Sequence, residues 1–314
     1  MNIKKIGLTA LAASLVSVSA QAGEMSVNGG ASMAIKNNSG VDAGKVITMG
    51  NQLTFTGGGE LDNGLNVSLS FVLDHADNDA QGFDSHSITV SSDALGSITI
   101  AGDGAGNAQS ALDTTAAGDI WNNGFKAGAA DTAYVPMKGS DASDSSVNYT
   151  LPTLVDGLAV AGSYQALNST GSGSTAFGAT YSGIEGLSLS YGQGSSDDVK
   201  DKQGDQTIMK ASYAYGPITV AASNNDFDHT TASNDQEVSS VSLSYTVSDQ
   251  ISVSYGEETI DRSGSASDIE VTGVSISYTS GGMTASFATV EAENVDHTAG
   301  LDKEVWKIGL SFAF

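Results

Sequence analysis

Apolar and polar side chains alternate along most of this chain in short runs. Between residues 65 and 73 every second position is large and apolar, and the positions between them are mostly Asn and Ser. The same period of two recurs at residues 27–35, 158–164, 187–191, 209–215, 241–247, 251–255 and 274–278. Such a period is typical of β-strands with one apolar and one polar face. The pattern therefore predicts an all-β fold.

Tight turns separate these runs at regular intervals. Turn signals at residues 63–64, 94–96, 156–157, 185–186, 216–217, 248–249 and 281–282 suit short hairpin connections. These seven hairpins give fourteen strands, and a first strand from about Glu24 and a last strand ending at Phe314 raise the total to about sixteen. Eight longer connections, near residues 37, 77, 103, 169, 198, 228, 264 and 296, alternate with the hairpins.

Short turns on one rim, long loops on the other and an even number of strands are typical of bacterial outer-membrane barrels. A β-sandwich also alternates, so the alternation by itself leaves a soluble fold open. The turn spacing favours a transmembrane antiparallel β-barrel, with its apolar faces toward lipid and its polar faces toward the lumen.

The first 22 residues have a different pattern. Lys4 and Lys5 precede an apolar run over residues 6–18, and a small-residue site ends at Ala22. This is the pattern of a cleaved secretory signal peptide, and the run is shorter than the roughly 20 residues that a spanning helix needs. We expect residues 1–22 to be removed and residues 23–314 to form one barrel domain in the outer membrane.

Charge and cysteine content narrow the functional classes. Removing two of the 12 basic residues leaves 10 against 36 acidic residues, a net charge of −26. Binding to nucleic acid or to anionic lipid surfaces is excluded, because both would be repelled. The chain has no cysteine, and a domain of this length can bury a core without disulfides.

The strand pattern is interrupted between residues 103 and 143. These residues show no alternation, and here the spacing between tight turns doubles. A stretch of this length without strand or helix pattern is uncommon inside a compact domain and is usually functional or disordered. By the count of turns it follows the fifth strand, on the rim that carries the long loops.

The last strand has the most specific signal. Between residues 305 and 314 the even positions are Trp306, Ile308, Leu310, Phe312 and Phe314, whereas the odd positions include Lys307, Gly309 and Ser311. This end resembles the carboxy-terminal signature of outer-membrane barrels, in which the final Phe is recognised by the barrel-assembly machinery.

Together with the strand count, the signal peptide and the long loop after the fifth strand, this signature is similar to the trimeric general-diffusion porins of Gram-negative bacteria, in particular the Rhodobacter-type alphaproteobacterial family. The local likeness is best over residues 96–106 and 147–158. The resemblance implies a homotrimer in outer-membrane lipid and a third long loop that folds inward to narrow the pore. It places acidic side chains on that loop opposite a basic cluster on the wall.

By position, residues 103–143 correspond to the constricting loop. Asp113, Asp119 and Asp131 are its best candidate carboxylates, with Asp103 at its start, and we expect Trp121 and Phe125 to pack the loop against the wall. Ordinary solvation of loop carboxylates is the alternative for each acid.

The basic side of the pore departs from the family pattern, because the chain has a single arginine, Arg262, near the outer rim. Alternation places Lys36, Lys210 and Lys307 on polar faces, so they are the candidates for the lumen wall. Each lysine also fits a solvated position near a strand end. Acidic loops and few bases predict a channel that prefers cations.

Other apparent motifs carry little chemistry. Asp77 and Asp79 resemble the start of a calcium loop, but Ile88 stands where the bidentate acid is needed. We therefore expect no cofactor, with weak loop-bound Ca²⁺ as the alternative. The four histidines show no metal-binding spacing, and no Ser/His/Asp grouping stands out.

Three functional classes remain. A closed barrel of about sixteen strands encloses water, so a pore for small hydrophilic solutes and ions is the favoured function. A surface-exposed β-rich adhesin or binding protein is the first alternative. An outer-membrane enzyme is the second, and it would need a catalytic group that the sequence does not offer.

Overall fold

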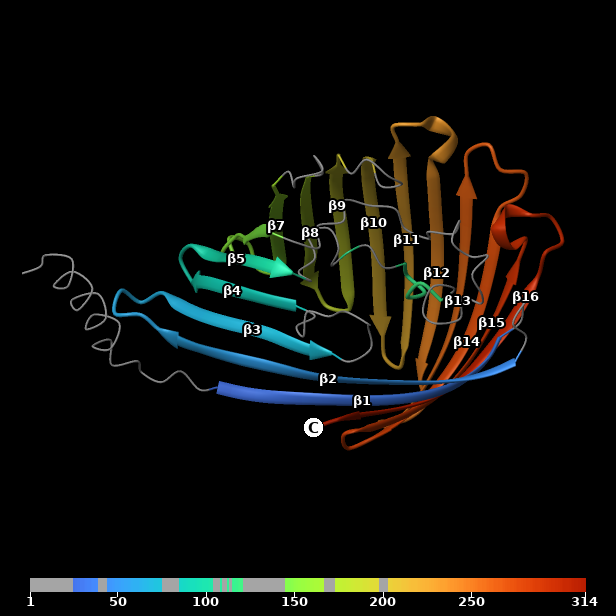
Figure 1. The fold of residues 1–314 in the computed structure, drawn as a ribbon, viewed down its shortest axis with the longest axis horizontal. Coiled ribbons are helices and arrows are strands. Elements are labelled where there is room, and N and C mark those ends of the chain that lie inside the picture. Colours follow the sequence, from blue (N-terminus) through green and yellow to red (C-terminus); the bar gives the residue numbers. More distant parts are fainter. Residues whose placement is uncertain are drawn as a thin grey trace, which may run out of the picture.

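The computed structural model describes residues 25–38, 44–74, 85–103, 108, 112, 115–120, 145–166, 173–197 and 203–314. In this part of the chain, sixteen strands form one closed antiparallel barrel, in which each strand pairs with the next and β1 pairs with β16 (Figure 1). The strands are β1 (Met25–Asn38), β2 (Gly44–Glu60), β3 (Asn66–Asp74), β4 (Ser85–Ser92), β5 (Gly96–Asp103), β6 (Ser146–Thr150), β7 (Leu158–Gln165), β8 (Ser174–Ile184), β9 (Leu187–Ser196), β10 (Gly204–Tyr215), β11 (Ile218–His229), β12 (Gln236–Thr246), β13 (Ile251–Arg262), β14 (Ile269–Ser280), β15 (Met283–Glu293) and β16 (Lys303–Ala313).

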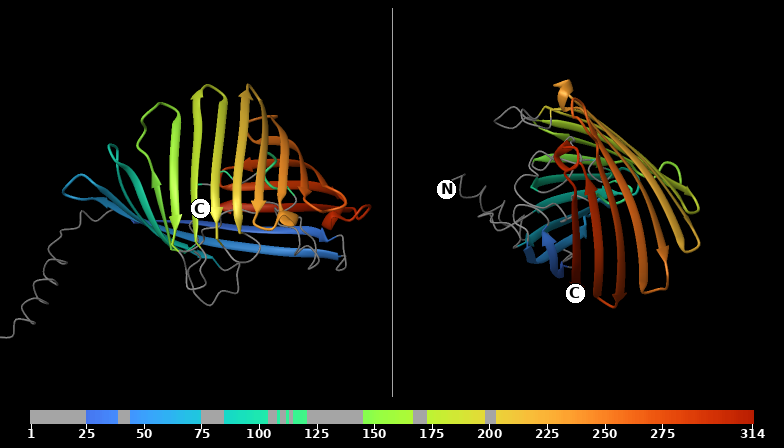
Figure 2. Two further views of the ribbon diagram at one scale, coloured as in Figure 1. Left: turned by 90° about the horizontal axis from the view of Figure 1, so that it is seen from above. Right: turned by 90° about the vertical axis from the view of Figure 1, so that its right-hand side faces the viewer.

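The predicted fold class is confirmed, and the sandwich is excluded because the sheet closes on itself. All seven predicted hairpins occur, and the strand ends that the eight longer connections join lie on the opposite rim. Gly64 and Gly157 have φ of 81° and 77°, a left-handed conformation that favours glycine in such turns. We call the two ends of the barrel the short-turn rim and the long-loop rim. Figure 2 shows the strands curving around a common axis.

Helical structure is confined to short pieces in the described part of the chain. Two 3-10 turns, Ala232–Asn234 and Val295–His297, lie in long connections. No helix among the described residues is long and apolar enough to cross a membrane.

The outer surface of the barrel is apolar toward the short-turn rim. On β14 the outward side chains Val274, Ile276 and Tyr278 are 40–45 % exposed, and inward Ser275 and Ser277 alternate with them. Inside the barrel, hydroxyl groups pair across neighbouring strands, as between Ser254 and Ser275 at 2.6 Å. Apolar side chains outside and hydroxyls inside are the arrangement expected of a membrane barrel with a watery lumen.

Toward the long-loop rim this alternation reverses its phase on β12 to β15. On β14 the outward residue becomes Glu270, and the inward residues become Ile269 and Val271, which are at most 1 % exposed. The alternation in the sequence predicts a polar lumen, and over this part of the wall that prediction is wrong. The inward residues form an apolar cluster inside the barrel: Val238, Ile260, Ile269, Val271, Val290, Ala292, Val295 and Val305.

The closing pair of strands has a local feature of its own. Phe314 and Gly29 exchange two backbone hydrogen bonds, of 2.7 and 2.9 Å. A side chain at Gly29 would meet the Phe314 ring, because an added Cβ would lie 2.2 Å from its Cε2 atom. Gly29 therefore makes room for Phe314 of the same chain.

Candidate functional site

We call the connection between β5 and β6 (residues 104–145) the inner loop, and residues 108 and 115–120 of it lie against the inner wall of the barrel. Its described residues are 108, 112, 115–120 and 145, and the segment 115–120 lies beside β11 to β13 (Figure 1). Four of its backbone N–H groups donate to inward-facing side chains of the wall. At 2.9 Å each, these bonds run from Ala108 to Ser163, from Ala116 to Ser223, from Ala117 to Ser240 and from Ile120 to Glu258.

Glycines on the wall give the loop backbone room to approach. An added Cβ at Gly256 would lie 2.6 Å from the Cβ of Ala117, and one at Gly273 would lie 3.1 Å from the Cδ1 of Ile120. On β8, an added Cβ at Gly178 would lie 2.4 Å from the Ala108 carbonyl oxygen. Three strands therefore carry glycine where the loop passes, which is a common use of glycine within a strand.

Within the loop, Thr115 and Asp119 close a turn by two reciprocal hydrogen bonds. The Thr115 N–H donates to the Asp119 carboxylate at 2.8 Å, and the Asp119 N–H donates to the Thr115 hydroxyl oxygen at 2.8 Å. Asp119 has a φ of 52°, a left-handed conformation in which Asp is enriched among non-glycine residues. The Thr115 hydroxyl in turn donates to Glu258 at 2.5 Å.

Burial raises the pKa of the Asp119 carboxyl above its ordinary value of 3.8, and the hydrogen bonds from Thr115 and the Lys210 ammonium oppose the rise. Lys210 lies directly opposite Ser223 in the β10–β11 pair, on the stretch of wall that holds the loop. The structure thus brings the predicted acid Asp119 and the predicted base Lys210 together on the same side of the barrel.

The other two predicted wall lysines lie elsewhere. Lys36 of β1 and Lys307 of β16 are direct cross-strand neighbours and, by alternation, face the lumen. Lys303 lies on the same face of β16, and Arg262 ends β13 with a 2.7 Å hydrogen bond to Asn234. Of the six basic residues that the structure describes, only Lys45 lies on an outward face. The described wall of the lumen is therefore richer in bases than the overall charge suggests.

The carboxylates of the strands are distributed in the opposite way. On β10 to β16, exposed acids face outward near the long-loop rim: Asp205, Asp226, Asp228, Glu237, Glu257, Asp261, Glu270, Glu291, Glu293 and Glu304. Several of these acids lie directly opposite one another on neighbouring strands, for example Asp226 opposite Glu237 and Glu270 opposite Glu293. Like charges in such pairs are destabilising, so this band is maintained at a cost in stability.

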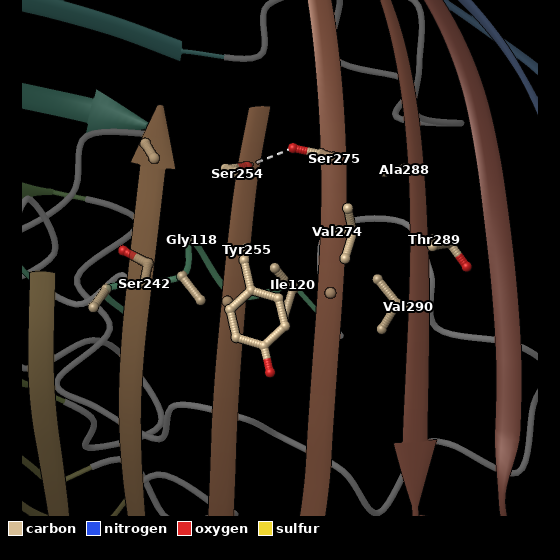
Figure 3. Close-up of a pocket in the computed structure, with 15 residues that line it drawn as sticks. Gly118, Ile120, Ser242, Ser254, Tyr255, Val274, Ser275, Ala288, Thr289 and Val290 are labelled. Carbon is tan, nitrogen blue, oxygen red and sulfur yellow. Dashed lines mark hydrogen bonds between the residues drawn. The ribbon is translucent and has the colours of Figure 1, made fainter. Parts of the chain in front are cut away.

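A cavity of about 280 Å³ lies between the inner loop, at Ala116–Gly118 and Ile120, and the wall strands β12 to β15. Figure 3 shows Gly118 and Ile120 of the loop beside Ser242, Ser254 and Ser275 of β12 to β14. Small, hydroxyl and branched apolar residues line the cavity, and none of its described lining residues is charged. The cavity is thus a neutral part of the lumen that the loop partly covers.

Several predicted site residues fall outside the described part of the chain. These are Asp77, Asp79, Asp113, Trp121, Phe125 and Asp131, together with the side chain of Asp103, whose backbone ends β5. Their assigned roles stay predictions. Among the described residues, no group of three or more His, Asp or Glu side chains could hold a metal ion.

The residues that hold the loop, above all Glu258 and the glycines Gly256 and Gly273, were not predicted from the sequence. A signal for them is present in the sequence. The inward positions of β13 are Ser254, Gly256, Glu258 and Ile260. Before Glu258 the apolar side chains of this strand face outward, and after it they face inward. A phase change within a strand marks the level at which something other than water covers the inner wall.

A closed sixteen-stranded barrel with lipid-facing apolar side chains and a loop folded into its lumen defines an outer-membrane channel protein. Residues 7–297 match the family model described as Gram-negative porin, and the chain belongs to this family. It is therefore an outer-membrane porin. A comparison with curated protein sequences gives no match.

Solved structures with the same fold include porins. One, described under the asymmetric conductivity of engineered proteins, has a TM-score of 0.69 and 16 % identity. Two variants of Rhodopseudomonas blastica porin have TM-scores of 0.67 and 16 % identity. In each case 93 % of this chain and 100 % of the other are covered. At this identity the likeness supports the fold and not the function of individual residues.

Proposed function

We propose that this porin is a passive channel for small hydrophilic solutes and ions that prefers cations, with the inner loop as its constriction. The observation that supports the preference most is the charge distribution: 36 acidic against 12 basic residues in the sequence, with a band of carboxylates at the long-loop rim. Carboxylates around a pore mouth concentrate cations and repel anions.

The lumen wall moderates this preference. Lys36, Lys303 and Lys307 gather on β16 and β1, and Lys210 lies near Asp119. Bases inside the pore favour anions locally, so the selectivity reflects a competition between the acidic mouth and loop and the lysines of the wall. Because exposed charges are screened over about 8 Å at physiological salt, the cation preference should weaken as the salt concentration rises.

The test is the reversal potential of single channels in a KCl gradient across a planar bilayer. The wild-type channel should be cation-selective. Asp113→Asn, Asp119→Asn and Asp131→Asn combined should lower the permeability ratio of K⁺ to Cl⁻ by roughly twofold or more. Asparagine keeps the oxygen that accepts the Thr115 N–H, so the loop turn is retained.

The matched control neutralises three outward acids, Asp226, Asp228 and Glu237, in the same way. A smaller effect of the control would locate the selectivity in the loop. Equal effects would assign it to the overall field, and anion selectivity of the wild-type channel would overturn the cation preference while leaving the porin family intact.

The proposal extends to processing and assembly. We expect cleavage after Ala22, recognition of Phe314 by the barrel-assembly machinery, assembly of three copies in outer-membrane lipid, and no catalytic activity. The resemblance to general-diffusion porins supports these points. A trimer-sized band in unheated gel samples that heating converts to a monomer would agree with a homotrimer, and a monomer in unheated samples would contradict it.

A further inference from the structure

Glu258 occupies a boundary on the inner wall. It is 1 % exposed. Ser240 of β12 and Val271 of β14 lie directly opposite it, and Gly256 and Ile260 flank it on the same face of β13. The apolar cluster begins on its long-loop side, and the hydroxyl-lined wall begins on its short-turn side. A carboxylate at this position is therefore largely shielded from water.

Burying a carboxylate is costly unless hydrogen bonds stabilise it. The Oε1 atom of Glu258 accepts two of them from the loop, from the Thr115 hydroxyl at 2.5 Å and from the Ile120 N–H at 2.9 Å. The N–H groups of Ala108, Ala116 and Ala117 donate instead to serines of the wall. Hydrogen bonds to a charged acceptor are about twice as strong as those between neutral groups, so Glu258 makes the strongest of these contacts.

The two residues that bind Glu258 lie on either side of the turn that Thr115 and Asp119 close. Thr115 begins this turn and closes it through Asp119, and Ile120 directly follows Asp119 and lies against Gly273. One carboxylate thus holds both sides of the turn, whereas Ser223 and Ser240 each hold one residue between them. Loss of Glu258 removes the contact that ties these two sides together.

We propose that Glu258 is a positioning residue of the channel, which holds the turn of the inner loop against β13 and thereby fixes how far the loop projects into the pore. The inference rests on the proposed role of this loop as the constriction. It predicts that an intact Glu258 keeps the open channel at one conductance level and that its loss lets the loop leave the wall.

Single-channel recording tests the proposal. Glu258→Ala should increase the fraction of time spent outside the main conductance level by about tenfold or more, because charged hydrogen bonds to a buried group are lost. Glu258→Gln keeps an acceptor oxygen without the charge and should have a smaller effect. Glu257→Gln is the matched control, since Glu257 is exposed on the outward face and accepts a hydrogen bond from Tyr255.

A disulfide separates positioning from a direct effect of the charge on ions. An added Cβ at Gly273 would lie 3.5 Å from the Cβ of Ile120, within the usual disulfide range of about 3.5–4.5 Å. The chain contains no other cysteine. Oxidised Ile120→Cys/Gly273→Cys added to Glu258→Ala should restore the single conductance level, and reduction should abolish the rescue.

Several outcomes would overturn the proposal. A steady current in Glu258→Ala would show that the loop needs no such contact, and fluctuations that persist after oxidation would show that Glu258 acts through its charge. A wild-type protein that passes no current would instead overturn the proposed channel function. Where Glu258→Ala fails to form the barrel, judged by heat-modifiable migration, Thr115→Val removes one of the two hydrogen bonds from the loop side and should also destabilise the single level.

Discussion

The two ends of strands β12 to β15 use the same alternation in opposite ways. Near the short-turn rim, apolar side chains such as Val274 and Ile276 face outward, and serines face the lumen. Near the long-loop rim, Glu270 and its neighbours face outward, and Val271 and Ile260 face inward. The first end separates lipid from a watery lumen, and the second separates a polar exterior from an inner core beside the loop. Alternation therefore reveals a strand, while its phase reveals what each face touches.

The largest expected effect comes from placing a charge in the inner core. Val271→Asp puts an unpaired carboxylate at a position that is 1 % exposed, and we expect it to lower the free energy of unfolding by about 3–5 kcal/mol. Ser277→Asp lies on the same inward face of β14 but in the hydroxyl-lined part, and it should cost about 1 kcal/mol or less. Denaturant titration of the folded barrel measures both, and equal costs would contradict an inner core.

A single methyl group distinguishes the covered wall from the open wall. Gly256→Ala would place its Cβ 2.6 Å from Ala117 and should destabilise the barrel by about 1–3 kcal/mol or displace the loop. Gly30→Ala has no atom closer than 3.6 Å to the new Cβ, and it should stabilise β1 by roughly 0.5 kcal/mol. The free energy of unfolding and the single-channel conductance should both differ between Gly256→Ala and Gly30→Ala. If both variants changed the free energy of unfolding in the same direction, the result would contradict a contact between the loop and Gly256.

Neutralising the lumen-facing lysines Lys36 and Lys307 should change the ion selectivity of the channel more than the stability of the barrel. Lys36→Gln with Lys307→Gln removes a directly opposed like-charge pair, so the free energy of unfolding should rise by about 0.2–1 kcal/mol. The cation preference in a KCl gradient should increase, because two lumen bases are lost. Lys45→Gln lies on the outward face opposite Asn37 and is the control. An equal shift in its reversal potential would mean that the lumen position of the lysines is unimportant.

The smallest expected effect is the titration of Asp119. Because its folded-state pKa is raised above 3.8, mainly by burial, the folded state binds a proton more readily than the unfolded state does. The contribution of Asp119 to stability should therefore increase as the pH falls through the raised pKa toward 3.8, and it should fall as the pH rises through that window. The difference in unfolding midpoint between wild type and Asp119→Asn, followed across this window, measures it. A difference of the opposite slope would contradict burial as the dominant cause.

The parts of the fold that follow local rules could be predicted from the sequence. Hairpins could be placed because turns such as 63–64 and 156–157 need glycine at a left-handed position. The inward direction of Lys36, Lys210 and Lys307 followed from counting alternate residues. Both rules act over a few residues, so one chain contains enough information to apply them.

The parts that depend on distant contacts could not be predicted in the same way. Glu258 binds Thr115 and Ile120 from 143 and 138 residues away, and no local pattern links them. The need for glycine at position 29 could not be predicted either, because it arises from the Phe314 ring at the other end of the chain. At Glu258 the apolar side chains of β13 change from the outward to the inward face. This change in the sequence shows where the inner wall is covered, but it does not show that residues 115–120 cover it.

The central claim is that residues 115–120 lie on the inner wall of the open channel. Oxidation of Ile120→Cys/Gly273→Cys in the otherwise unchanged barrel tests it most directly, because the two Cβ positions are 3.5 Å apart. The structure predicts that the disulfide forms readily in the folded protein and leaves the single-channel conductance as it was. A pair that stays reduced in the folded barrel, or a disulfide that shifts the conductance to a new level, would contradict this position of the loop.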